Sequence, residues 1–148
     1  MKKLLFILMI GSLFGEYYIS PGIQVGINSS KEYFFSYQAT FGLFVDNGFP
    51  GITFGRRHYK TGIKEWNSYN YIDAQIAADL LTRFAAPLVP GIGIGVIYDN
   101  SNIFYKYKLF SGFLGLGTCD YINFKNKPKM HFGGFVVLPI PNECPWCF

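Results

Sequence analysis

The segment 17–28 reads YYISPGIQVGIN, and its residues alternate in character with a period of two. Every second residue from Tyr17 to Ile27 is aromatic, aliphatic or proline, whereas the residues between them are mainly Ser, Gly, Gln and Asn. Successive side chains of a strand point to opposite faces, so this pattern predicts a strand. A polar segment ends at Glu32, and residues 33–44 then resume the alternation, which predicts a β-hairpin.

The polar face of these two segments carries Ser, Gln, Thr, Asn and Gly and no charged residue. We would expect Lys, Glu or Arg on a strand face that meets water. Small uncharged polar side chains fit the filled interior of a narrow barrel, where they hydrogen-bond to one another. The opposite, apolar face then lies on the outside of the barrel.

A short Pro-Gly pattern recurs at Pro21, Pro50 and Pro90, and each copy is followed by alternating residues, a polar turn and an aromatic-rich segment. The repeating unit is therefore a hairpin, and we expect each proline at the first residue of a strand, where its missing N–H is tolerated. The predicted fold is all-β, an antiparallel up-and-down β-barrel of about eight strands built from repeated hairpins.

Two segments leave the strand count and one connection open. Residues 103–124 fit either one long strand or two strands that bend at 115–117, which gives seven or eight strands in total. We choose eight because single-chain outer-membrane barrels have even numbers of strands. We expect a strand from Trp66 to about Ala78, a helix or loop over 79–86, and a last strand over 130–140.

The composition excludes several classes of protein. The chain has 148 residues, of which 50% are hydrophobic, 20% aromatic and 15% charged, so it cannot remain disordered and is long enough for one domain. The formal net charge is +4, but Lys2 and Lys3 belong to a predicted targeting segment and contribute half of it. We therefore expect no nucleic-acid partner.

The amino terminus resembles a targeting signal. Two lysines precede the apolar run 4–10, and small residues follow at Gly11 and Ser12. This arrangement is typical of a bacterial secretory signal peptide, and the run is shorter than the ~20 residues of a spanning helix. The predicted organisation is a signal peptide over 1–15, a β-barrel domain over 16–141 and a cysteine-containing tail over 142–148.

With this signal, the alternating strands, the aromatic residues near strand ends and the terminal Phe148, the chain resembles small bacterial outer-membrane β-barrel proteins. The resemblance is one of pattern, covers about 17–140 and singles out no characterised family. It implies a location in the bacterial outer membrane. The chain departs from the family's usual terminal strand, because Pro139, Pro141 and Pro145 interrupt its last segment.

Charged and polar residues supply the candidate sites. A basic cluster comprises Arg56, Arg57, His58, Lys60 and Lys64. It is a candidate for contact with anionic lipid, including lipopolysaccharide, although an ordinary solvated turn has the same composition. The predicted inward face carries Gln24, Gln38, Asp73 and Gln75. An inward aspartate needs a partner, and we expect Arg57 or Lys106 to pair with Asp73.

Catalytic and cysteine chemistry have weaker support. Some small outer-membrane barrels are lipid-modifying enzymes with a histidine, a serine and a carboxylate. The nominal set in this chain is His131, Ser111 and Asp120, and no spacing motif supports it. Disulfide candidates are Cys144 and Cys147, in a C-x-x-C pattern, and Cys119. We predict no metal site and no cofactor.

The sequence therefore predicts an exported outer-membrane barrel with a structural or binding role in the cell envelope and a packed lumen too narrow for an open pore. One alternative is a lipid-modifying barrel enzyme. Another is a periplasmic or secreted soluble β-barrel that binds an apolar ligand in its core. The sequence does not identify a protein partner.

Overall fold

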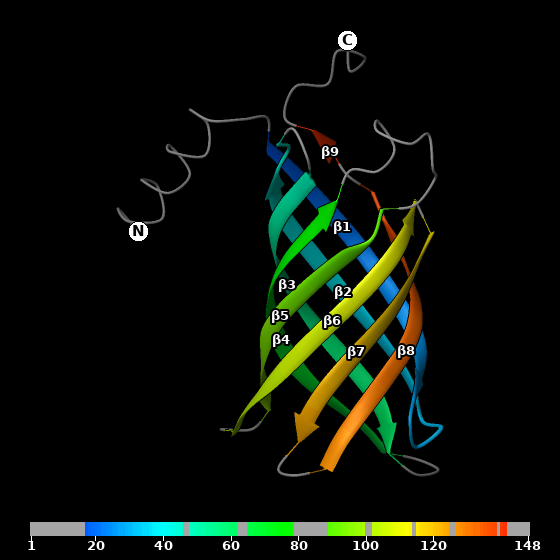
Figure 1. Ribbon diagram of the computed structural model, residues 1–148. Coiled ribbons are helices and arrows are strands. Elements are labelled where there is room, and N and C mark those ends of the chain that lie inside the picture. The colour runs from blue at the N-terminus through cyan, green and yellow to red at the C-terminus, as the bar shows by residue number, and fades with distance from the viewer. Residues whose placement is uncertain are drawn as a thin grey trace.

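The computed structural model describes residues 17–45, 48–61, 65–78, 89–99, 102–113, 115–124, 127–138 and 140–141. Figure 1 shows these residues as tilted strands that wrap around one axis to form a barrel. The described residues contain no helix long and apolar enough to cross a bilayer. The predicted signal peptide, the segment 79–86 and the tail 142–148 lie outside the described residues, so the expectations for them stay predictions.

The described residues form nine strands in a single sheet, and the ninth has only two residues. The strands are β1 (Tyr17–Asn28), β2 (Tyr33–Leu43), β3 (Gly48–Thr61), β4 (Glu65–Ala78), β5 (Gly91–Asp99), β6 (Asn102–Phe113), β7 (Gly115–Phe124), β8 (Lys127–Val137) and β9 (Ile140–Pro141).

Each strand from β1 to β8 pairs antiparallel with the next along the chain, and β1 also pairs with β8, which closes the sheet into a barrel. The predicted antiparallel up-and-down barrel of eight strands is confirmed. Residues 103–124 form two strands, because β6 ends at Phe113 and β7 begins at Gly115. The short β9 continues the line of β8 by pairing Ile140 with Ile19 of β1.

Burial alternates along the strands as the period of two predicts. In β1, the even-numbered residues are buried or half-buried and the odd-numbered residues are exposed. The buried polar set faces the interior and includes Ser20, Gln24, Asn28, Ser36, Gln38, Thr40, Thr53 and Thr118. The barrel interior therefore holds many polar and charged side chains beside buried apolar ones such as Ile97, Ile122 and Phe135, whereas the outer face is apolar, unlike that of a water-soluble domain.

The recurrent prolines do not all begin strands, which corrects one expectation. Pro21 is the fifth residue of β1, Pro50 is the third residue of β3, and Pro90 directly precedes β5. The position of Pro21 is tolerated because its carbonyl still accepts a hydrogen bond from the Leu138 N–H at 3.0 Å, and this contact lies in the gap between β8 and β9. A proline that lacks an N–H thus sits where the ladder is already interrupted.

A tight turn joins β1 and β2 at one end of the barrel. Figure 1 shows the start of β1 and the short β9 near the upper end, and the β1–β2 turn at the lower end. In that turn the Asn28 side-chain oxygen accepts hydrogen bonds from the backbone N–H groups of Ser30 and Glu32 at 2.9 and 3.0 Å. Lys31 has a positive φ of 61°. The asparagine therefore stabilises a tight turn that includes one left-handed residue.

Candidate functional site: the charged lumen and the outer face

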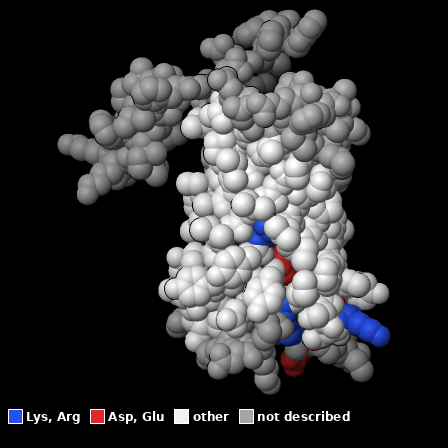
Figure 2. Space-filling model, viewed as in Figure 1, with Lys and Arg blue, Asp and Glu red and all other residues white. Residues whose placement is uncertain are grey.

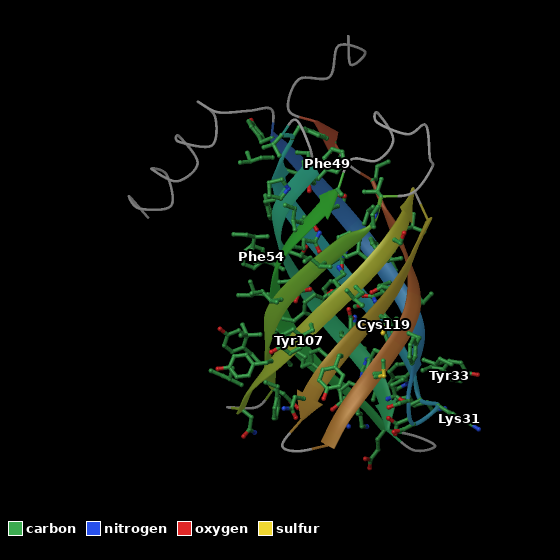
Figure 3. The ribbon with its side chains drawn as sticks, in the orientation of Figure 1. Lys31, Tyr33, Phe49, Phe54, Tyr107 and Cys119 are labelled. Carbon is green, nitrogen blue, oxygen red and sulfur yellow. The ribbon has the colours of Figure 1, made fainter. Side chains whose placement is uncertain are left out.

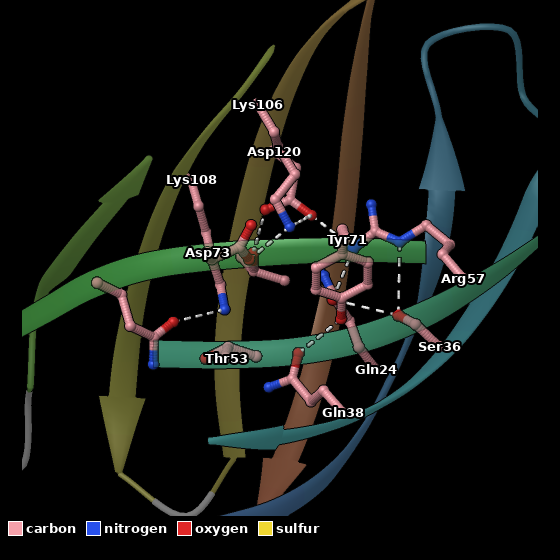
Figure 4. A network of polar contacts seen from close by, with 12 residues as sticks. Gln24, Ser36, Gln38, Thr53, Arg57, Tyr71, Asp73, Lys106, Lys108 and Asp120 are labelled. Atoms are coloured by element: carbon pink, nitrogen blue, oxygen red, sulfur yellow. Dashed lines mark hydrogen bonds and ion pairs between the residues drawn. The ribbon is translucent and has the colours of Figure 1, made fainter. Parts of the chain in front are cut away.

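Two ion pairs lie inside the barrel between residues that are far apart in the sequence (Figure 4). Arg57 of β3 contacts Asp120 of β7 at 2.5 Å, and Lys106 of β6 contacts Asp73 of β4 at 2.6 Å. Lys106 also lies 4.0 Å from Asp120, which links the two pairs. All four side chains are essentially inaccessible to solvent. Strands from different sides of the barrel are thus joined by charge through its interior.

Neutral partners complete the surroundings of Arg57. Its guanidinium donates to Gln24 Oε1 at 2.7 Å and to Ser36 Oγ at 3.4 Å, and it lies 3.2 Å from Nδ1 of His131. The guanidinium carbon also lies 4.3 Å from the centroid of the Phe34 ring, a cation–π distance. This arginine is thereby held by contacts to several strands at once.

A second polar layer lies farther along the lumen. The Tyr71 hydroxyl donates to Gln38 Oε1 at 2.9 Å, and the Thr40 and Thr53 hydroxyls lie 2.7 Å apart. Large buried side chains thus occupy the interior where an open channel would need space.

The third cation of the lumen has no carboxylate partner among the described residues. Lys108 donates to Gln75 Oε1 at 3.1 Å, and its ammonium lies 5.0 and 5.1 Å from the ring centroids of Phe110 and Phe135. Three buried cationic side chains therefore face two buried carboxylates, which leaves one excess positive charge in this part of the barrel.

The nominal catalytic set is not assembled. His131 and Asp120 are neighbours across β7 and β8 and both are buried, but Ser111 is exposed on the outer face of β6. Asp120 is engaged by Arg57. A serine outside the barrel cannot be activated by a histidine inside it, so these residues do not form a nucleophile–base pair. The described residues also contain no group of three or more His, Cys, Asp or Glu that could hold a metal ion.

The basic cluster is divided by the barrel wall. Arg57 is fully buried in the lumen, which corrects the expectation that it contacts lipid. Arg56 points outward and donates to the Ser68 hydroxyl at 2.9 Å, and the His58 ring stacks on Phe35 with centroids 4.7 Å apart. The cause is the period of two, which places adjacent residues on opposite faces. Lys60 is half-buried near the end of β3, and Lys64 lies outside the described residues.

The other candidate residues are placed as follows. Gln24, Gln38 and Asp73 are buried and Gln75 is half-buried. The structure pairs Asp73 with Lys106, one of the two partners we expected for it. Cys119 is a free, half-buried thiol on β7. The other two disulfide candidates, Cys144 and Cys147, lie outside the described residues, so their pairing stays a prediction.

The sequence reasoning missed the lumen position of Lys108. It assigned Arg57 both to the lipid-contacting cluster and, as a possible partner of Asp73, to the lumen, although the period of two gives a signal for both residues. In β6 the residues Tyr105, Tyr107 and Leu109 are exposed, so Lys108 must share the inward face with Lys106. In β3, Arg57 has the same parity as the inward Thr53. Grouping charges by adjacency conceals this relation, whereas counting in steps of two reveals it.

The outer face of the barrel is apolar and carries aromatic residues mainly toward one end. Phe54 and Tyr33 project away from the wall in Figure 3. Aliphatic residues dominate the part nearer the start of β1 and the short β9, and Figure 2 shows no charged atoms on the upper described part of the visible face. An aromatic girdle lies toward the end with the β1–β2 turn and consists of exposed Tyr33, Phe35, Tyr37, Trp66, Tyr98, Tyr105, Tyr107, Tyr121 and Phe132.

Comparisons with known proteins give one structural likeness. No family model matches the chain, and no curated protein matches it. A solved structure from work titled "De novo design of transmembrane beta-barrels" is similar, with a TM-score of 0.49 and 14% sequence identity over 82% of this chain and 95% of that one.

Proposed function

We propose that this protein is a membrane-spanning β-barrel of the bacterial outer membrane, with a structural or binding role in the cell envelope. The observation that carries the proposal is the inverted distribution of side chains. Fully buried Arg57, Asp73, Lys106 and Asp120 lie inside the barrel, and isoleucines, valines and leucines cover its outside. A bilayer stabilises this arrangement because acyl chains replace water at the apolar outer face.

The exposure of the outer aliphatic residues argues against a water-soluble barrel. Ile94 is 64% exposed, Leu109 60% and Val136 65%. These residues come from β5, β6 and β8, so the apolar surface extends around the barrel. Monomeric soluble proteins rarely expose contiguous apolar patches larger than a few hundred Å².

Strand length and aromatic placement support the same proposal. The main strands have 9 to 14 residues, and a tilted strand needs about 9–11 residues to cross a bilayer. The aromatic girdle fits the headgroup boundary, since Tyr and Trp side chains combine an apolar ring with a polar group. Tyr105, for example, is 66% exposed on the outside of β6.

The packed lumen supports a binding or structural role over general diffusion of solutes. Eight strands enclose a space just wide enough for side chains. Here the space contains arginine, tyrosine and two lysines that contact residues of non-adjacent strands. A solute could pass only if these contacts broke together.

Reconstitution of the full chain tests both parts of the proposal. The mature protein refolded into phospholipid vesicles should resist extraction at high pH and migrate faster on a gel when unheated than when boiled. In a planar bilayer it should show no steady open-channel conductance. When cells are fractionated, release of the protein into the soluble periplasmic fraction without detergent would contradict membrane residence. A stable large conductance in the planar bilayer would contradict the closed lumen.

A further inference from the structure

A groove on the outer face of β2, β3, β4 and β5 combines a polar lower wall with an apolar upper wall. It has a volume of about 650 Å³. Its outward-facing lining residues are Tyr37, Ala39, Phe54, Arg56, Asn70, Ile72 and Tyr98, and inward-facing Gln38, Gly55 and Tyr71 form its floor.

The polar wall is a row of register partners across four strands. Tyr37 of β2 is opposite Arg56 of β3, Arg56 is opposite Asn70 of β4, and Asn70 is opposite Tyr98 of β5. Both tyrosines belong to the aromatic girdle and are about half exposed, at 51% and 46%. The row therefore lies at the depth where the girdle would meet lipid headgroups.

The apolar wall lies two residues farther along the same strands. Ala39, Phe54 and Ile72 are successive register partners on β2, β3 and β4, directly above the polar row. Phe54 is 47% exposed and projects outward (Figure 3). An acyl chain fits this wall, whereas a soluble polar ligand would leave it in contact with nothing apolar.

Arg56 supplies a positive charge that no described carboxylate neutralises. Its described hydrogen bond goes to the neutral Ser68 hydroxyl at 2.9 Å, and no ion pair joins it to another described residue. Ser68 lies on the side of Asn70 that is nearer the turn end of β4, so the guanidinium extends away from the apolar wall and toward the girdle end. This direction is the one a long cationic side chain adopts at a membrane interface.

We propose that this groove binds one anionic glycerophospholipid, with the phosphate on Arg56 and one acyl chain along Ala39, Phe54 and Ile72. The inference rests on the proposed membrane location. Charge complementarity selects the occupant, because one arginine balances one phosphate charge, and a guanidinium donates two parallel hydrogen bonds to phosphate oxygens. Asn70 and the two tyrosine hydroxyls supply further donors along the same row.

Lipid retention measured by native mass spectrometry tests the assignment. The mature protein, folded in detergent micelles, is titrated separately with phosphatidylglycerol, phosphatidylcholine and lipid A. We expect the wild type to retain phosphatidylglycerol more strongly than phosphatidylcholine, whose choline offsets the phosphate charge. Arg56→Gln should weaken phosphatidylglycerol retention about tenfold and phosphatidylcholine retention less. Lys31→Gln is the matched control, because it removes the same charge from an exposed residue at the same end of the barrel, outside both the groove lining and the basic cluster.

A second variant probes the apolar wall and keeps the charge. Ala39→Phe fills the upper groove beside Phe54 and should weaken retention of both lipids with Arg56 intact. The heat-dependent gel mobility of each variant first shows that it has folded into a closed barrel. If Arg56→Gln does not fold, Ala39→Phe still tests the proposal.

Three results would overturn the inference. These are equal retention of phosphatidylglycerol by Arg56→Gln and Lys31→Gln, unchanged retention of phosphatidylglycerol and phosphatidylcholine by Ala39→Phe, or Arg56-dependent retention of lipid A without retention of phosphatidylglycerol. A wild type that does not fold into vesicles at all would instead contradict the proposed membrane location. The two failures are therefore distinguishable.

Discussion

Replacing Asp120 with asparagine would leave a buried arginine without its counter-ion. Asp120 contacts Arg57 at 2.5 Å and Lys106 at 4.0 Å, and both its own side chain and that of Arg57 are fully inaccessible. Asparagine has nearly the same shape, so the change removes the charge with little change in packing. The effect on stability then reports the electrostatic contribution of this carboxylate.

The expected loss of stability depends on the partners that Arg57 and Lys106 retain after the substitution. Lys106 retains its pair with Asp73 at 2.6 Å, so the loss falls mainly on Arg57. Arg57 retains a neutral acceptor in Gln24 at 2.7 Å. Breaking one partner out of a buried ion pair costs about 3–5 kcal/mol, and the remaining neutral contacts place Asp120→Asn near about 3 kcal/mol.

Urea titration in vesicles measures this loss. The folded fraction is read from the heat-dependent gel mobility, and the free energy of unfolding is extrapolated linearly to zero urea. Asp99→Asn is the matched control, since Asp99 is the last residue of β5 and only half-buried, and it should change stability by less than about 0.5 kcal/mol. An equal, small effect of Asp120→Asn and Asp99→Asn would refute the reasoning that the lumen pair is desolvated.

A cycle with a second variant isolates the pair itself. Arg57→Met alone would leave Asp120 with only the more distant Lys106, at 4.0 Å, and Arg57→Met combined with Asp120→Asn removes both charges of the pair. The double variant should lose about 1–3 kcal/mol less than the sum of the two single losses, because each single change strands the other charge. Additive losses would show that the two groups do not interact in the folded barrel.

Three further predictions concern other parts of the molecule. Gly95→Ala should destabilise the barrel strongly, because a Cβ there would collide with the carboxylate of Asp73. Gly117→Ala should have little effect, because the nearest atom to its Cβ would be 4.0 Å away, and urea titration compares the two variants. The Asn28 amide donates to Glu32 at 2.7 Å and lowers the pKa of that carboxyl, so ionised Glu32 stabilises the folded barrel above the ordinary pKa of 4.5, and this contribution is lost as pH falls through the lower folded pKa. The Glu32→Gln variant should therefore show a smaller drop in the free energy of unfolding on acidification than the wild type, and parallel pH profiles would contradict this. Ile94→Lys should cost about 2–4 kcal/mol in vesicles if the outer face meets lipid, and a loss under about 0.5 kcal/mol would contradict that.

The strands and their two faces could be predicted from the sequence because their signal is local. In β1, apolar residues at every second position from Tyr17 determine which side chains face outward, whatever lies beside the strand. The same count would have separated Arg56 from Arg57. It was obscured because neighbouring charges in a sequence suggest a common surface, although adjacent residues of a strand cannot share one.

The contacts across the lumen could not be predicted in the same way. Arg57 and Asp120 come from β3 and β7, which are not adjacent in the barrel. Which inward residues meet depends on the register of every intervening pair of strands and on the tilt that closure imposes. A period of two shows that Asp73 faces inward, but the choice of Lys106 over Arg57 as its partner needs the closed barrel.

The environment of the outer face is the central claim, and spin-label accessibility in vesicles tests it most directly. A single label is placed in turn at Ile23, Ile94 and Leu109 on the outside, and at Ser30 in the β1–β2 turn, in a cysteine-free background. Collisions with oxygen, which concentrates in lipid, should exceed those with a water-soluble nickel reagent at the three outer positions, and the order should reverse at Ser30. Greater collision with nickel at all four positions would show that water, and not lipid, surrounds the barrel.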